Sequence, residues 1–330
     1  DELCGLEVTV PGRADGGPRL CLNGHLDVVA PGTERWEHGP WSGLVAEGQV
    51  HGRGSVDMKG GVVAALHAMA DRGPAAGCQV VLWAVASEED GGQGTFAALE
   101  ADRAFDACLI PEPTGLEVVC AQAGSLTFEG VVGGRAAHAG MRLEGESAID
   151  NYVQVHMALA AHERDINAGV EYDLMAALEL PYPVSVGRVS GGEWASSVPD
   201  RVEFTGRLGV PVGQDLDEAR AALRRALAGL PVQVSFTGGV FAPGATDPRH
   251  PFAALVLESF PGSSAVGVPW GADMRQYTAL GIPAVMVGPG NAHLAHAVDE
   301  RVPIDDLAAL AEGIGRVIDG FGGPAHTLSP

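Results

Sequence analysis

The stretch from Gly52 to Gly61, Gly-Arg-Gly-Ser-Val-Asp-Met-Lys-Gly-Gly, sets one carboxylate, that of Asp57, between two pairs of glycines. Glycine lets the backbone approach a ligand closely and adopt dihedral angles that other residues avoid. A helical run over residues 62–71 follows, and the free N–H groups of its first turn point back toward the same spot. The stretch has neither the Gly-Lys-Ser/Thr ending of a P-loop nor the G-x-G-x-x-G pattern of a dinucleotide site. The stretch is suited to fixing an acidic side chain beside a cation. Whether it does so depends on the other residues that lie near Asp57.

Two polar residues follow the second predicted strand. Residues 6–10 and 19–23 read as strands with a Pro/Gly turn between them, and the second strand leads into His25 and Asp27. Alternation after a strand places these two side chains on the same side. The histidine could then bind a metal through one ring nitrogen while the carboxylate held the other nitrogen. A His and an Asp at the mouth of a loop is the alternative interpretation of so short a motif.

Three glutamates follow two later strands. Residues 78–86 form an apolar run of β-forming residues, typical of a strand buried on both faces, and the chain then reaches Glu88 and Glu89. Open α/β sheets place their sites at this end of their central strands. Glu112 follows a short strand over 106–110 and is presented rigidly between two prolines. Each motif alone also fits a solvated loop or a plain turn.

The candidate ligands share a position at the ends of predicted strands or in the turns after them; they are His25, Asp57, Glu88, Glu89, Glu112 and a late histidine, His293 or His296. Nitrogen and carboxylate ligands without cysteine suit zinc, manganese or cobalt in a catalytic site. Even when one of the two paired glutamates is set aside, the remaining five ligands are too many for one ordinary catalytic zinc. They fit two metals that share a bridging carboxylate, roughly 3.5–4 Å apart, and activate a water between them. One of the paired glutamates is then free to act as general base.

The elements that must position these residues belong to an interrupted α/β pattern. Residues 122–239 have a different character and follow the order strand, helix, strand, strand, helix, strand, which is the ferredoxin-like order. We interpret this segment as an inserted α+β domain. The α/β pattern resumes after it, so residues 1–121 and 240–330 are expected to form one discontinuous, three-layer catalytic domain.

Composition narrows the class of protein further. The net charge of −22 argues against nucleic acid and anionic membranes as partners. No apolar run reaches the length of a membrane span, and no signal segment is visible. The sequence starts without Met, close to strand-like sequence, so we expect a truncated or processed N-terminus. Five scattered cysteines read as reduced core residues of a cytoplasmic protein: Cys4, Cys21, Cys78, Cys108 and Cys120.

Six short motifs are distributed along nearly the whole chain. They are Gly24-His25-Leu26-Asp27, the stretch from Gly52 to Gly61, Ser87-Glu88-Glu89, Glu112-Pro113-Thr114, Gly134-Arg135-Ala136-Ala137-His138, and Gly288-Pro289-Gly290 with His296-Ala297-Val298-Asp299-Glu300. With them the sequence resembles the di-metal amidohydrolase and peptidase family of acetylornithine deacetylases, succinyl-diaminopimelate desuccinylases, aminoacylases and glutamate carboxypeptidases. The resemblance implies a zinc-peptidase-like catalytic domain with an inserted dimerisation (lid) domain.

The resemblance also implies a role for each ligand. Asp57 would bridge both metals, His25 and Glu112 would complete one site, and Glu89 and His296 the other. His296 is preferred to His293 because it fits the family's H-x-x-[ND]-E pattern. Two metal ions per chain are expected, with zinc as the first choice and cobalt or manganese as alternatives.

Catalytic roles follow from the same resemblance. Asp27 would orient His25, and Glu88 would be the general base. A cis peptide bond is expected after the bridging carboxylate, at Asp57–Met58. His138, in the inserted domain, is expected to reach the partner subunit's active site in a homodimer and to steady the oxyanion.

Three residues match positions where relatives bind substrate. Arg207 and Arg275 are placed where a guanidinium receives a substrate carboxylate, for which its planar shape is well suited. Ser197 falls where many members carry Asn. The missing N-terminal helical segment of the family would remove packing but none of the metal ligands.

The function expected from the sequence is a cytoplasmic, homodimeric two-metal hydrolase that cleaves the amide of an N-acyl amino acid. The sequence from Trp270 to Glu300 is nearest to acetylornithine-deacetylase-like deacylases. A dipeptidase or carboxypeptidase of the same family is the runner-up. A non-catalytic binding protein on this scaffold is a third possibility, against which the intact Glu88 argues.

Overall fold

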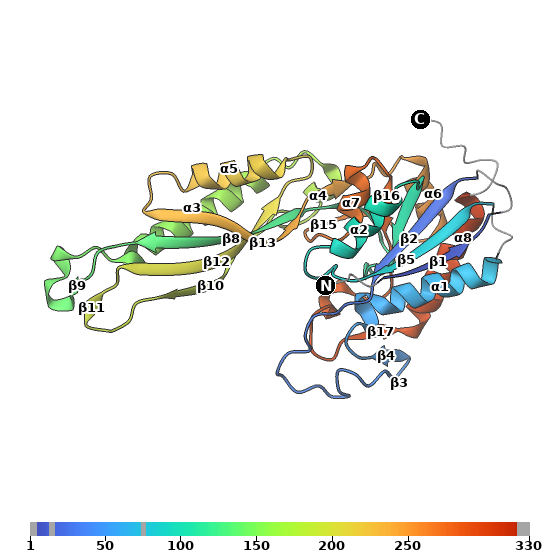
Figure 1. Cartoon of the computed structure of the whole chain (residues 1–330), viewed down its shortest axis with the longest axis horizontal. Helices are drawn as coiled ribbons and strands as arrows, with labels where there is room; N and C mark the ends of the chain where they lie inside the picture. Colours follow the sequence, from blue (N-terminus) through green and yellow to red (C-terminus); the bar gives the residue numbers. More distant parts are fainter. Residues whose placement is uncertain (1–4, 13–16, 74–76, 322–330) are drawn as a thin grey trace. The chain divides into compact units, whose positions relative to one another are not determined.

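The computed structural model describes residues 5–12, 17–73 and 77–321. Cys4, the start of the chain and part of the turn between the first two strands lie outside the described residues. The chain divides into two compact units, which Figure 1 shows as ribbons. The first unit comprises residues 1–121, 244–266 and 272–330, and the second unit comprises residues 122–243 and 267–271.

An eight-stranded sheet forms the centre of the first unit. Seven strands follow one another across the sheet, and an eighth, β15 (Ala265–Val268), pairs with β7. The order is β1 (Leu6–Val10), β5 (Gln79–Val85), β2 (Arg19–His25), β6 (Ala107–Ile110), β16 (Ala284–Met286), β7 (Val118–Gln122) and β14 (Gly244–Ala245). The four strands β5, β2, β6 and β16 run parallel, whereas β1 is antiparallel to β5. The ends of β5, β2 and β6 therefore meet at one edge of the sheet.

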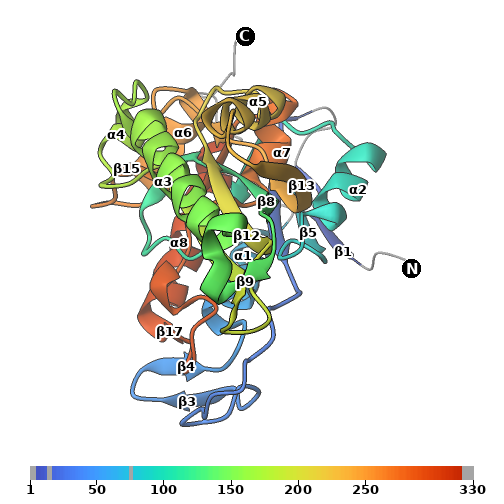
Figure 2. The same ribbon diagram turned by 90° about the vertical axis from the view of Figure 1, so that its left-hand side faces the viewer.

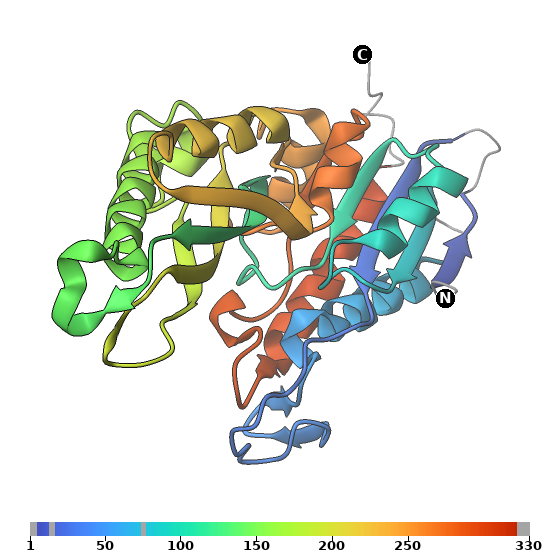
Figure 3. The same ribbon diagram turned by 60° about the vertical axis from the view of Figure 1, so that its left-hand side comes forward.

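The central strands are buried on both faces. Six consecutive residues of β5 are buried, and all four residues of β6 are buried, as their uninterrupted apolar sequences predict. The helices of this unit, seen from another side in Figure 3, are α1 (Gly60–Arg72), α2 (Gln93–Ala101), α6 (Pro251–Ser259), α7 (Met274–Ala279) and α8 (Ile304–Phe321). Among them α1 packs on β2, β5 and α8, and α7 packs on β6 and β16.

Smaller elements complete the first unit. A three-stranded sheet has the order β17 (Arg301–Pro303), β4 (Gln49–His51), β3 (Leu44–Ala46). The sequence patterns did not predict this sheet, because its strands are only three residues long. Two short helical segments are η1 (Ser55–Lys59) and η4 (Ala292–Leu294).

The second unit has the ferredoxin-like arrangement that its element order predicts. Its antiparallel sheet has the order β10 (Val184–Gly191), β12 (Arg201–Val210), β8 (Gly124–Gly133), β13 (Val232–Phe241). Its main helices, α3 (Ala148–Asn167) and α5 (Leu216–Ala226), are visible in Figure 2. They begin where side chains of Ser147 and Asp215 accept backbone N–H groups of the first turn. Also present are α4 (Asp173–Ala176), η3 (Ala139–Glu144) and the ladder of β9 (Ala137–His138) with β11 (Ser197–Val198).

One face of this second sheet carries the helices. Alternate residues of β12 are buried, and Val202, Phe204 and Leu208 pack in one core with Val155 of α3 and Leu223 of α5. The residues between them, on the same strand, face away from the helices. The alternation confirms a sheet with one covered face, as in α+β domains.

Candidate metal centre

Asp57 places its two carboxylate oxygens beside two different imidazoles. Oδ1 lies 3.1 Å from His25 Nε2, and Oδ2 lies 3.3 Å from His296 Nε2. Each imidazole has a further carboxylate nearby: Glu112 Oε1 is 3.9 Å from His25 Nε2, and Glu89 Oε2 is 3.0 Å from His296 Nε2. The arrangement has the symmetry expected of a bridging carboxylate with one histidine and one glutamate on each side.

The structure distinguishes between the two late histidines. His296 contacts Asp57 and Glu89, whereas His293 is exposed on η4 and makes no such contact within the described residues. His296 has a φ of 61°, in the left-handed region that residues other than glycine seldom adopt. Such strained backbone occurs most often at functional sites.

His25 is the last residue of β2, and its side chain is 1% exposed. Its Nδ1 lies 3.0 Å from the main-chain oxygen of Asp27 and 3.6 Å from Asp27 Oδ1. The expected support of the ring by Asp27 is thus made first through the main-chain oxygen, with the carboxylate somewhat farther away. Either contact leaves Nε2 facing Asp57.

Close backbone packing brings the Gly52–Gly61 stretch to Glu112. A Cβ added to Gly61 would overlap with the main-chain oxygen of Pro111, so only glycine allows the start of α1 to approach this strand end. The peptide bond at Asp57–Met58 is cis, which confirms the expectation from the resemblance.

A buried ion pair supports Asp57 from behind. Glu300 is fully buried, and its Oε1 accepts hydrogen bonds from the backbone N–H groups of Val56 (3.0 Å) and Asp57 (3.1 Å). Its Oε2 lies 2.5 Å from Arg53 Nη1, and Arg53 Nη2 donates to the main-chain oxygen of His296. We did not predict roles for Arg53 and Glu300, although both lie inside motifs quoted above. The signal available in the sequence was the presence of a charged residue, Arg53 or Glu300, inside each of these motifs.

Glu88 and Glu89 lie on a tight loop after β5, which we call the base loop (residues 87–92). The Asp27 carboxylate accepts the backbone N–H of Glu89 at 3.1 Å and that of Glu88 at 3.4 Å. Asp27 therefore links the imidazole of His25 to this loop. Ser87 has a φ of 63°, and both glycines at the end of the loop have positive φ.

Glu88 is 7% exposed, and its Oε1 is buried without a hydrogen-bond partner among the described residues. Burial, and then the charge of Asp273, raise the pKa of Glu88 to about 8. An unpaired buried carboxylate is costly to a fold and is retained at functional sites. Its raised affinity for a proton is the property a general base needs near neutral pH.

The carboxylates of the cluster lie close together, and their negative charges favour the binding of cations. Burial and then the charge of Asp57 raise the pKa of Glu112 well above its ordinary value. Hydrogen bonds to Asp57 and Glu89 raise the pKa of His296 to about 10. Burial opposes the shift at Asp57, yet its hydrogen bonds with His25 and His296 lower its pKa. Two imidazoles and three carboxylates without a thiol fit two divalent cations of the zinc type.

The candidate ligand atoms form two close groups. One atom each from His25, Asp57 and Glu89 lie within 4.8 Å of one another, and the same holds for His25, Glu88 and Glu112. Glu88 thus lies close enough to the ligands to reach a molecule bound between them.

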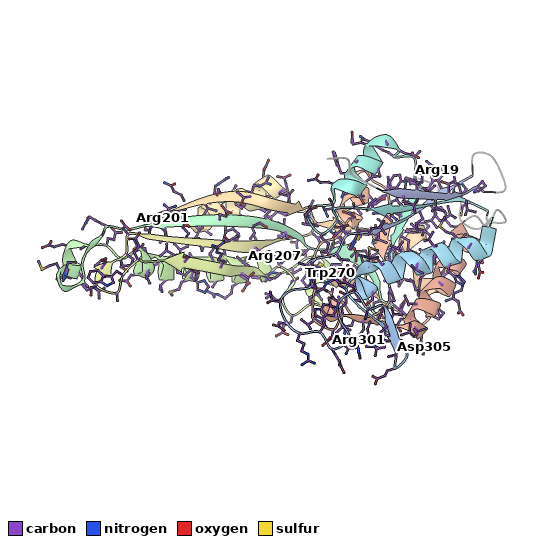
Figure 4. All side chains as sticks on the ribbon, turned by 60° about the horizontal axis from the view of Figure 1, so that its bottom comes forward. Arg19, Arg201, Arg207, Trp270, Arg301 and Asp305 are labelled. Atoms are coloured by element: carbon purple, nitrogen blue, oxygen red, sulfur yellow. The ribbon has the colours of Figure 1, made fainter. Side chains whose placement is uncertain are left out.

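The remaining predicted residues fall into both units. In the second unit, His138 and Ser197 are paired across the β9–β11 ladder, and both are exposed. His138 Nδ1 accepts the backbone N–H of Gly140 at 3.1 Å. Arg201 begins β12, and Arg207 lies toward the other end of this strand (Figure 4). Arg207 Nη2 donates a hydrogen bond to the main-chain oxygen of Pro269. In the first unit, Arg275 is buried on α7.

The amino-acid sequence matches the peptidase family M20/M25/M40 over residues 21–319. A succinyl-diaminopimelate desuccinylase of Methylorubrum extorquens is 30% identical, with 92% of this chain and 83% of the relative covered. The M20 family metallo-carboxypeptidase Sso-CP2 of Sulfolobus solfataricus has a similar structure, with a TM-score of 0.76 and 17% identity over 96% of this chain and 88% of that one. The YXEP protein of Bacillus subtilis, a dinuclear metal binding peptidase from the M20 family, has a TM-score of 0.65 and 17% identity over 96% and 87%.

The fold and the cluster of histidines and carboxylates define a metal-dependent hydrolase of the metallopeptidase and amidohydrolase class. The chain belongs to the peptidase family M20/M25/M40. This confirms the family and the two-domain α/β architecture expected from the sequence motifs. Within the described residues, no helix combines the length and apolar character needed to cross a bilayer.

Proposed function

We propose that this hydrolase removes the acyl group from an N-acyl amino acid, as a deacetylase or desuccinylase does. The observation that carries the proposal is Asp57, whose oxygens face His25 and His296, with the unpaired Glu88 beside the same cluster. The similarity to a succinyl-diaminopimelate desuccinylase over most of both chains supports the choice of a deacylase.

The proposed ligands are His25 and Glu112 for one cation and Glu89 and His296 for the other, with Asp57 between them. Two divalent cations, zinc as the first choice, would supply Lewis-acid activation of a water and of the amide carbonyl. Glu88 takes a proton from the attacking water and passes it to the amide nitrogen as the C–N bond breaks, so that a carboxylic acid and an amine leave. The buried, acidic surroundings keep Glu88 basic enough to accept this proton.

His138 is proposed to donate a hydrogen bond to the developing oxyanion from a second subunit. Its Nδ1 already accepts the Gly140 N–H, so a neutral ring carries its proton on Nε2, where it is free to be donated. Arg207 is proposed to receive the substrate carboxylate, and Ser197, opposite His138 on the ladder, to add a polar contact.

A homodimer is proposed because the second unit exposes apolar surface. Ile149, Val153 and Met157 of α3 are 46%, 52% and 66% exposed, and their four-residue spacing places them on one helix face. On the same unit β10 lies at the edge of the sheet. Substitution of Val153 by Glu is expected to yield monomers in analytical ultracentrifugation.

The experiment begins with metal content. Protein dialysed against zinc, cobalt or manganese is analysed for metal per chain and then assayed on N-acetyl and N-succinyl amino acids and on dipeptides. Two metals per chain and hydrolysis of N-acyl amino acids, lost with a chelator and restored by metal, are expected. Two metals without any turnover would favour a binding protein, and one metal or none would contradict the ligand set.

A second candidate is a carboxypeptidase or dipeptidase of the same family. It is favoured by the likeness to a metallo-carboxypeptidase, and preferential hydrolysis of dipeptides in the same panel would select it. We further propose a cytoplasmic location, since the four cysteines of the described residues are free and buried.

A further inference from the structure

The base loop is attached on its far side to α7, a segment labelled in Figure 1. Arg275 is 6% exposed, and its Nη2 donates to the main-chain oxygen of Gly91 at 2.8 Å. Its Nη1 donates to the main-chain oxygen of Ala272 at 3.0 Å. The guanidinium thus joins the last turn of the loop to the residues just before α7.

Gln276 makes a parallel attachment. Its Nε2 donates to the main-chain oxygen of Gly92 and to Asp273 Oδ1, each at 2.8 Å. Asp273 is 2% exposed, and its Oδ2 accepts a hydrogen bond from the hydroxyl of Thr95. Thr95 in turn accepts a hydrogen bond from Asn23 on β2. A continuous buried network therefore runs from the central sheet to the end of the base loop.

The backbone of Gly92 packs closely against the side chains that make this attachment. Gly92 has a φ of 72°, and an added Cβ would overlap with Asp273 Oδ1, Gln276 Nε2 and Arg275 Nη2. The loop backbone lies directly on the polar groups of α7 because glycine has no side chain. On its near side the loop is held by the Asp27 carboxylate, through the N–H groups of Glu88 and Glu89.

We propose that Arg275 is a positioning residue that fixes the base loop, and with it Glu88 and Glu89, and that it does not receive the substrate carboxylate. The proposal rests on the proposed function for its catalytic consequence. A guanidinium has five N–H donors in a rigid plane, and a buried one aimed at two carbonyls is committed to holding them in fixed relation. Arg275 Nη1 also lies 3.7 Å from the buried Asp273 Oδ1, whereas no carboxylate of the described residues forms an ion pair with Arg207.

The proposal predicts a specific kinetic signature for Arg275→Met. Groups that orient metal ligands from behind affect metal affinity or activity by about 10–100-fold when removed. We expect kcat to fall by about that factor and KM for an N-acyl amino acid to stay within about threefold, because ground-state binding is untouched. The preference for the acid over its α-carboxamide should be unchanged. Arg316→Met is the matched control, since Arg316 Nε also donates to a main-chain oxygen, that of Ser259.

Two further measurements need no turnover. Calorimetric titration with zinc should show one of the two metals bound more weakly in Arg275→Met by about tenfold. Hydrogen exchange of the peptide covering residues 86–94 should accelerate, with other peptides of the first unit unchanged. These readouts judge the positioning role even if the panel of N-acyl amino acids yields no substrate, in which case the proposed function fails by itself.

Gln276→Met provides a second, uncharged variant. It removes the bond to Gly92 and cannot weaken a charge contact with a substrate, so the same changes in kcat, zinc affinity and exchange are expected at smaller size. It also keeps the proposal testable if Arg275→Met fails to fold. A tenfold rise in KM and a lost preference for the acid in Arg275→Met, with zinc affinity and exchange normal in both variants, would overturn the proposal.

Discussion

In the first unit the candidate ligands His25 and Glu112 and the candidate base Glu88 are buried, whereas in the second unit His138 and Ser197 are exposed. His25 and Glu112 are 1% and 5% exposed, and Glu88 is 7% exposed. His138 and Ser197 are exposed on a ladder of two residue pairs, supported by local hydrogen bonds. The buried side chains of the first unit are held in place by the packing of its hydrophobic core.

This difference indicates how each set is prepared for its task. Buried carboxylates in contact repel one another and lose hydration, so folding stores an unfavourable energy that cations can relieve. Exposed polar side chains cost the fold little, and their geometry is completed only by a bound partner or substrate. We therefore expect metals to act on the first unit and substitutions at His138 to act on turnover alone.

Removal of the metals is expected to have the largest effect. Chelation should abolish hydrolysis and lower the stability of the first unit, since a ligand at 100 times its Kd stabilises the folded state by about 2.7 kcal/mol. Hydrogen exchange followed by mass spectrometry should show faster exchange in peptides of the first unit and little change in those of the second. Re-addition of zinc is the control, and equal loss of protection in both units would break the comparison.

Glu88→Gln is expected to rank next. It keeps the size of the side chain but removes the proton acceptor, and general base catalysis contributes about 10²–10⁴-fold to rate. We expect kcat to fall by this amount while elemental analysis still finds two metals per chain. Asp90→Asn, in the same loop but exposed, should turn over normally. Near-normal turnover by Glu88→Gln would exclude its role as base.

His138→Gln tests the exposed set. Loss of one oxyanion donor costs about 10²–10³ in kcat, and we expect this without a change in metal content or thermal stability. His156→Gln, an exposed histidine of the same unit, is the matched control. Co-expression of the His138→Gln and Glu88→Gln chains should restore activity, since one site of the mixed dimer then has both groups. No restoration would argue that His138 acts within its own chain or not at all.

The smallest effect concerns a buried histidine of the second unit. Burial lowers the pKa of His162, an effect that Arg225 reinforces and Asp165 opposes. The unfolded chain therefore binds more protons than the folded one between the lowered pKa and the ordinary value of about 6.5. The free energy of unfolding of the second unit should fall as pH drops through this window. Urea unfolding of His162→Gln should show a flatter pH dependence, and an unchanged slope would contradict the burial argument.

Much of the candidate site could be predicted because it follows the ends of strands. The apolar run of β5 and the turns after β2 and β6 indicated where His25, Glu88 and Glu112 would meet, since neighbouring parallel strands end at one edge. The choice of His296 over His293 came from a motif and is matched by its contacts with Asp57 and Glu89. Ferredoxin-like order was also readable, since long amphipathic helices and alternating strands carry strong periodicity.

The supporting contacts could not be predicted in the same way. Arg53 and Glu300 meet although 247 positions separate them, and no local pattern specifies such a pair. For Arg275 the motif suggested a substrate contact, while its hydrogen bonds run to Gly91 and Ala272. Which main-chain oxygen a buried guanidinium reaches depends on how two distant segments pack.

The sequence by itself determined which residue types are present at each strand end, and these histidines and carboxylates indicate a metal-dependent hydrolase. Residue chemistry and short-range periodicity are local properties, so they can be read along the chain. Only the tertiary structure decided that Asp57 lies between two imidazoles, that Glu88 keeps an oxygen unpaired, and that α7 holds the base loop. These features depend on distances of a few ångströms between segments far apart in sequence, which only close packing of the folded chain establishes.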